Sequence, residues 1–137
     1  MSSLAGKYEL LSDPADRAWD DFLIAVGVSD AHREALMMVK PTVEITVADG
    51  TWTLKILSEL ADQESVFTLG EKVTTRLDGA NPDGGTSVFT QPADNKLVES
   101  FTVGGIQGQV TRDFSADGLT TTFAGGGQVA VRKYKRV

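Results

Sequence analysis

The chain has 137 residues, of which 41% are hydrophobic, and its formal net charge is −6. This length and apolar content fit one domain over residues 1–137, and the negative charge argues against nucleic-acid binding and against electrostatic attachment to anionic membranes. Because the chain has no cysteine, no signal-peptide pattern and no apolar run near the ~20 residues that span a bilayer, we expect a soluble, cytoplasmic protein without disulfides.

Residues 15–39 show the pattern of two short amphipathic helices joined by a tight turn. Gly27 is expected to end the first helix, and Ser29 or Asp30 offers an N-cap for the second. Apolar residues recur at helical spacing in both segments. The apolar positions are Trp19, Phe22, Leu23 and Val26 in the first helix and Ala31, Ala35, Met38 and Val39 in the second.

After Pro41, nearly all of the chain has the alternating pattern of β-strands. Turn dipeptides such as Asp49-Gly50 and Asp117-Gly118 favour hairpins between successive strands. Ten short strands in hairpin succession suggest an up-and-down antiparallel meander that closes into a barrel, because closure removes exposed edges. The expected strands are 6–12, 42–48, 51–58, 63–70, 72–78, 86–91, 96–103, 106–115, 119–124 and 127–136.

Sequence signals for catalysis are weak, and we expect no catalytic residue, metal or cofactor. The only histidine, His32, lies on the polar side of the second helix and is expected to be a solvated surface residue. The segment AGGGQ predicts a hairpin turn, since no helix and lysine follow it. Glu99 would be a buried carboxylate if its face is inward, which leaves open a small barrel enzyme acting on a lipid or haem-like ligand.

Two late strands place arginine beside apolar residues. Arg112 shares a face with valine and phenylalanine, so alternation puts it inside, whereas Arg132 and Tyr134 share one face of a strand whose other face carries valines. If all three polar groups point inward, the two guanidinium groups need an anion, and a carboxylate matches their geometry. The alternative is that Arg112 pairs with Asp or Glu of a neighbouring strand and that Arg132 is exposed.

Several segments carry a family resemblance over nearly the whole chain. They are AGKYEL at 5–10, WDDFLIAVGV at 19–28, MMVKPTVEI at 37–45, FTLGE at 67–71, NKLVESF at 95–101, VTRDFSADGLTTTF at 110–123 and VAVRKYKR at 129–136. Together they resemble the intracellular lipid-binding proteins, which include fatty-acid-binding and cellular retinoid-binding proteins. The last two segments are the most specific, because they carry the family's Arg and then Arg-x-Tyr as Arg112, Arg132 and Tyr134. The segments SDPADRA and DGANPDGG are longer than is usual in the family, which leaves the geometry of the entrance open.

The resemblance implies a mainly β fold, a clam-shaped ten-stranded antiparallel barrel capped by a helix-turn-helix lid at about 15–39. It implies a non-covalent carrier of long-chain fatty acids whose carboxylate is bound by Arg112, Arg132 and Tyr134, with the valines facing outward. Leu60 and the 78–85 loop, which begins at Asp78, are expected at the entrance. The residues expected to line the ligand chain are Phe22, Leu23, Met38, Ile56, Phe67, Leu69, Phe101 and Phe123.

The sequence leaves two other binding roles open. The same anchor would serve retinoic acid or another bulky hydrophobic carboxylate, whereas neutral retinol would leave two arginines without an anion. A membrane-stacking role, which some family members play, needs basic faces, but both expected helices carry more acidic than basic residues. We therefore expect a monomer that makes at most weak, transient membrane contact.

Overall fold

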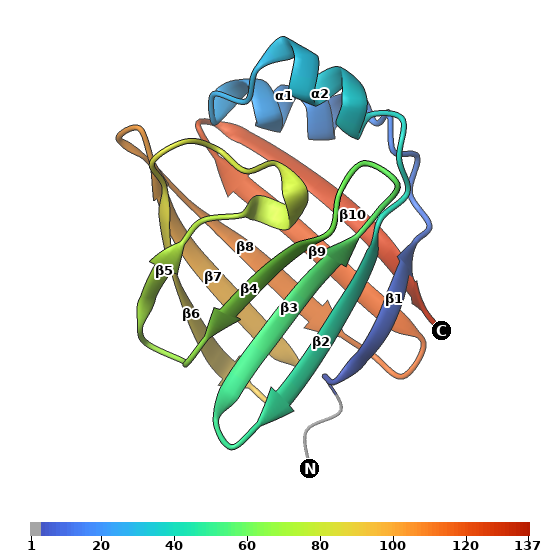
Figure 1. Ribbon diagram of the computed structural model, residues 1–137, viewed down its shortest axis with the longest axis vertical. Helices are drawn as coiled ribbons and strands as arrows, with labels where there is room; N and C mark the ends of the chain where they lie inside the picture. The colour runs from blue at the N-terminus through green and yellow to red at the C-terminus, as the bar shows by residue number, and fades with distance from the viewer. Residues whose placement is uncertain (1–3) are drawn as a thin grey trace.

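The computed structural model describes residues 4–137, and its main element is one ten-stranded antiparallel sheet that curls beneath two short helices (Figure 1). The expected barrel architecture is confirmed. The strands are β1 (Gly6–Leu10), β2 (Thr42–Ala48), β3 (Thr51–Leu57), β4 (Gln63–Phe67), β5 (Lys72–Thr74), β6 (Thr86–Ala93), β7 (Lys96–Val103), β8 (Ile106–Phe114), β9 (Gly118–Gly125) and β10 (Gln128–Arg136).

Hairpin connections determine the strand order, which is β4-β3-β2-β1-β10-β9-β8-β7-β6-β5. The first and last strands pair with each other, so Leu10 lies opposite Tyr134. The two ends of the ladder, β4 and β5, follow each other in the chain and lie next to each other. The sheet is therefore closed on all sides except between β4 and β5.

Helix α1 (Arg17–Ala25) and helix α2 (Asp30–Leu36) lie across one mouth of the barrel (Figure 1). The Ser29 side chain caps α2 by accepting a hydrogen bond from the His32 amide at 3.3 Å, as the sequence predicts. Helix α1 packs on β9 and β10, with Trp19, Phe22 and Leu23 buried. Within the part of the chain that is described, neither helix has the length and apolar composition to cross a bilayer.

The expected apolar stripe of α2 is wrong. This helix ends at Leu36, and Leu36 is its buried residue. Met38 lies beyond the helix end and is 84% exposed. The expectation assumed that the helical period continues to Met38. Because the helix ends two residues before Met38, this side chain does not lie on the inner face of α2.

The strands β4 and β5 end three and four residues before their expected ends, and the second difference determines where Asp78 lies. β4 ends at Phe67 instead of residue 70, and β5 ends at Thr74 instead of residue 78. The chain then forms a single 3₁₀ turn, η1 (Leu77–Gly79), which lies below the helices at the same mouth of the barrel (Figure 1). Leu77 and Asp78 have φ of 43° and 53° in the left-handed region, which carries the Asp78 side chain into the barrel.

The barrel interior contains two clusters of apolar side chains. One packs beneath the helices and includes Trp19, Phe22 and Phe123, with the Trp19 and Phe123 rings 4.6 Å apart. The other fills the opposite part of the barrel and includes Phe67 and Phe89, whose rings are stacked at 3.7 Å. Buried charged residues contact both clusters, because Arg132 lies over the Trp19 ring and Arg112 lies over the Phe89 ring.

Candidate functional site

Three neighbouring strands place two arginines in one row on the inner wall. Thr121 of β9 is the register partner of Arg112 on β8 and of Arg132 on β10. Since adjacent strands lie about 4.8 Å apart, the two arginine backbones are roughly 10 Å apart. Arg112, Arg132 and Tyr134 are each at most 2% exposed, so the inward orientation implied by the family resemblance is confirmed. The valines that alternate with them, Val129 and Val131, face solvent.

Arg112 is held by carboxylates of the chain itself. Its Nη2 donates to Asp78 Oδ1 of η1, and its Nη1 donates to Glu99 Oε1 of β7 at 3.1 Å. The alternative reading of the sequence is therefore right in one half, because Glu99 of a neighbouring strand pairs with Arg112, and wrong in the other half, because Arg132 is 2% exposed. Burial would lower the pKa of Arg112, but the two adjacent carboxylates outweigh this effect and raise it, so the guanidinium stays charged.

A chain of hydrogen bonds continues from Glu99 to the β5–β6 region. Ser87 donates its hydroxyl hydrogen to Glu99 Oε2 at 2.6 Å, and the Ser87 oxygen lies 2.7 Å from the Thr75 hydroxyl. Because the single Ser87 hydrogen is used on Glu99, Thr75 is the donor in the second contact. Burial raises the pKa of Glu99, and the neighbouring Arg112 acts in the opposite direction. Both oxygens of Glu99 are therefore engaged, which leaves this carboxylate poorly placed as a catalytic acid or base.

Arg132 has a different environment from Arg112. It is 2% exposed, and its Nε and Nη2 atoms have no hydrogen-bond partner among residues 4–137. Its guanidinium carbon lies 4.5 Å from the centroid of the Trp19 ring, which provides a cation–π contact. The hydroxyl of Tyr134, two positions along the same inner face, is also buried without a partner in the described chain. Burial raises the pKa of Tyr134 to about 12, with Arg132 opposing the shift, so this hydroxyl is protonated at neutral pH.

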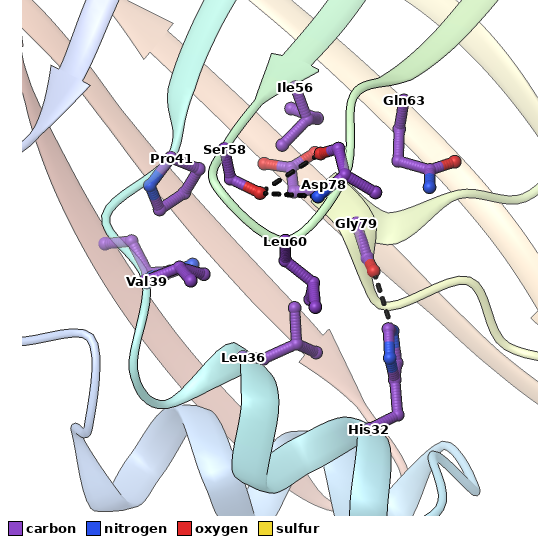
Figure 2. A pocket seen from close by; sticks show the side chains of 12 residues that line it. His32, Leu36, Val39, Pro41, Ile56, Ser58, Leu60, Gln63, Asp78 and Gly79 are labelled. Carbon is purple, nitrogen blue, oxygen red and sulfur yellow. Dashed lines mark hydrogen bonds between the residues drawn. The ribbon is translucent and has the colours of Figure 1, made fainter.

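A small pocket lies beside these groups, beneath α2. Its volume is about 40 Å³, and Asp78 and Arg132 are its charged lining residues. Figure 2 shows Leu36 of α2 and Leu60 of the β3–β4 turn pointing toward each other at its rim. This volume has room for roughly three water molecules, whereas sites for organic ligands measure roughly 300–1,000 Å³. A long-chain ligand can therefore enter only if protein groups move.

Helix α2 is tied to η1 by the only histidine. His32 Nε2 lies 2.9 Å from the main-chain oxygen of Gly79, the residue after Asp78 (Figure 2). A carbonyl oxygen only accepts, so His32 carries its proton on Nε2 and donates. The expectation that His32 is a solvated surface residue is therefore wrong. The contact joins residues 47 positions apart, so no local sequence pattern predicts it.

The other expected site residues divide into three groups. Phe22, Leu23, Ile56, Phe67, Phe101 and Phe123 are buried in the barrel. Met38 and Leu69 do not line the interior as expected. Met38 is 84% exposed, and Leu69, which follows the end of β4, is 40% exposed. Leu60 is 42% exposed at the pocket rim. Asp78 is buried against Arg112, so the expectation that Asp78 lies at the entrance is wrong.

Ser87, Thr75 and Trp19 were not identified as site residues from the sequence. Ser87 is two residues before Phe89 on β6 and shares its face, so the inward direction of Ser87 follows from the period of the strand. No group of three or more His, Cys, Asp or Glu side chains that could hold a metal ion occurs in residues 4–137.

Comparisons with known proteins agree with this geometry. No family model matches the chain. A fatty acid-binding protein of Tyrophagus putrescentiae is 38% identical over 99% of both chains, and one of Lepidoglyphus destructor is 34% identical over the same share. The structure of the Schistosoma mansoni fatty acid binding protein in complex with arachidonic acid has a TM-score of 0.88 at 26% identity, covering 100% of this chain and 98% of that one. At this identity and coverage, the chain belongs to the family of fatty acid-binding proteins.

Proposed function

We propose that the protein is a non-covalent carrier of long-chain fatty acids and that Arg132 and Tyr134 bind the ligand carboxylate. The observation that carries this proposal is the environment of Arg132, a buried guanidinium that lines the pocket and whose Nε and Nη2 atoms have no hydrogen-bond partner in the described chain. A buried charge without an anion is unfavourable, and a carboxylate fits the guanidinium fork. The protonated Tyr134 hydroxyl can donate one further hydrogen bond.

The apolar interior supports a long hydrocarbon chain as the remainder of the ligand. Phenylalanines 22, 67, 101 and 123 are all buried inside the barrel. Each methylene group removed from water contributes about 0.8 kcal/mol, so burial of the chain would supply most of the affinity. The charged anchor would then select acids over neutral lipids of the same length.

Arg112 is a weaker candidate for direct contact with the ligand than the sequence suggests. Asp78 and Glu99 already accept hydrogen bonds from two of its nitrogen atoms. The expected anchor of all three residues, Arg112, Arg132 and Tyr134, thus stays a prediction. The names of the relatives and the arachidonic acid bound in the Schistosoma mansoni structure support a fatty acid as ligand. A cytoplasmic location and a monomeric state also stay predictions.

Titration of the delipidated protein with oleate and with oleyl alcohol tests the proposal. Arg132→Gln should weaken oleate binding roughly tenfold to a hundredfold, because a charge-assisted contact contributes about 1.5–3 kcal/mol. Oleyl alcohol, which has no charge to lose, should be affected much less. Lys133→Gln, on the outer face of the same strand, removes the same charge and should leave both affinities unchanged.

Failure of the delipidated protein to bind any long-chain fatty acid at micromolar concentration would overturn the carrier function. Equal oleate affinities of Arg132→Gln and wild type would overturn the site. Retinoic acid is the second candidate ligand, since the same anchor would bind its carboxylate. A competition titration of oleate against retinoic acid establishes which of the two is preferred.

A further inference from the structure

Within residues 4–137, the barrel interior holds as many cationic side chains as acidic ones. Arg112 and Arg132 contribute two positive charges, and Asp78 and Glu99 contribute two carboxylates, all four at most 4% exposed. A ligand carboxylate would add a third anion to this interior. Asp78 and Arg132 line the same pocket, so an acid bound at Arg132 would place two carboxylates close together in a buried region. Because buried like charges repel each other, this arrangement favours a state in which one of the internal carboxylates gives way.

The two carboxylates differ in how firmly they are held. Glu99 lies in the middle of β7, and both of its oxygens are hydrogen-bonded, to Arg112 and Ser87. Asp78 belongs to a short 3₁₀ turn between strands, and its Oδ2 has no partner in the described chain. Its φ of 53° is in a region that residues with a side chain rarely adopt, so the turn is held inward against local strain.

We propose that Asp78 is an internal counterion that occupies the anion position beside Arg112 and that the ligand carboxylate displaces it. This inference rests on the proposed function. The carboxylate of the ligand then competes with the carboxylate of Asp78 for Arg112. The turn η1 moves outward as the ligand enters. Arg112 becomes available as a second guanidinium for the ligand once Asp78 has left.

Displacement of η1 would also provide the space that the ligand needs. Leu77, beside Asp78, is 1% exposed and packs in the apolar cluster beneath the helices. When this side chain leaves, an acyl chain can take over its contacts in a region where the present pocket measures only about 40 Å³. The hydrogen bond from His32 to Gly79 would break in the same movement, which releases α2 from the mouth of the barrel.

Removing the internal carboxylate is the first test. Asp78→Asn keeps the size of the side chain but removes its charge, and Asp83→Asn removes an exposed charge from the same loop as the matched control. We expect Asp78→Asn to bind oleate at least tenfold more tightly than wild type, with a smaller change for oleyl alcohol. Asp83→Asn should bind both ligands as wild type does. Equal or weaker oleate binding by Asp78→Asn would overturn the displacement.

Hydrogen exchange of the wild-type protein provides a second test that needs no variant. The amides of Gly79 and Asn81 donate to the Arg76 carbonyl, and the Ala80 amide donates to Leu77. Saturating oleate should make these amides exchange faster, although ligand binding slows exchange in the strands. The NMR signals of His32, the only histidine, should shift as its hydrogen bond is lost. Slower exchange at residues 79–81 with oleate would overturn the proposed movement.

The two proposals fail in different ways. Loss of oleate binding in Arg132→Gln together with unchanged affinity in Asp78→Asn would retain the carrier function and overturn the role of Asp78. Absence of oleate binding in both wild type and Asp78→Asn would overturn the carrier function and, with it, the displacement.

Discussion

The two interior arginines should respond in opposite ways to removal of their charge. In Arg112→Gln, Asp78 and Glu99 would remain buried near each other without their shared cation. Breaking a buried ion pair by removing one partner lowers the free energy of unfolding by about 3–5 kcal/mol. Among the described residues Arg132 has no carboxylate partner, so Arg132→Gln removes an unpaired charge at the expense of its contact with Trp19. We expect the delipidated Arg132→Gln protein to be at least as stable as wild type.

Thermal unfolding of the delipidated proteins measures this difference. For a chain of this size, each 1 kcal/mol shifts Tm by roughly 3–4 °C, so Arg112→Gln should melt roughly 10–20 °C below wild type. The double variant Arg112→Gln with Asp78→Asn should recover part of this loss, because one of the orphaned carboxylates is removed. Lys133→Gln on the outer face is the control for loss of a positive charge and should leave Tm unchanged.

The instability of Arg112→Gln should also depend on pH. Burial raises the pKa of Glu99 above its ordinary value of 4.5, and loss of Arg112 removes the main effect that opposes this shift. A folded-state pKa above the unfolded value means that folding takes up a proton, so stability is highest below about pH 4.5 and falls as pH rises. The gap between Arg112→Gln and wild type should therefore widen from pH 4 to pH 7. A gap that is constant over this range, or equal melting temperatures of Arg112→Gln and Arg132→Gln, would refute the assignment of Arg112 to the internal ion pairs.

Three further outcomes follow from the interior contacts. Burial raises the pKa of Tyr134 to about 12, so absorbance at 295 nm of a Tyr8→Phe variant should show little tyrosinate at pH 10.5. The ~3 kcal/mol of stability linked to Tyr134 should be lost between pH 10 and 12. Gly108→Ala would place a Cβ atom 2.3 Å from a main-chain oxygen of β9, so urea unfolding should show a stability loss of at least ~2 kcal/mol. Ser87→Ala leaves one Glu99 oxygen without its donor and should reduce the free energy of unfolding by about 1–3 kcal/mol, whereas the exposed Ser100→Ala on β7 should have no effect.

The periodic parts of the sequence predicted the fold well, because period and turn chemistry are local properties. Strand alternation placed Arg112 inside, and the helical spacing of Trp19 and Phe22 identified the buried face of α1. The site was harder to predict. The contact between Arg112 and Asp78 joins residues 34 positions apart and depends on two left-handed residues in a segment that was expected to be strand. His32 likewise bonds to a main-chain atom, which leaves no pattern of residue types to recognise.

The sheet topology explains why two arginines with equivalent register have different roles. Both pair with Thr121 of β9, so their inner faces are related by this central strand. On its other side, Arg112 borders β7, whose inner face carries Glu99 next to Leu97. The other neighbour of β10 is β1, where the buried side chains are Tyr8 and Leu10 and no carboxylate is available. The strand order thus pairs Arg112 within the protein and leaves Arg132 for an anion from outside, which is why charge removal should reduce stability at the first position and ligand binding at the second.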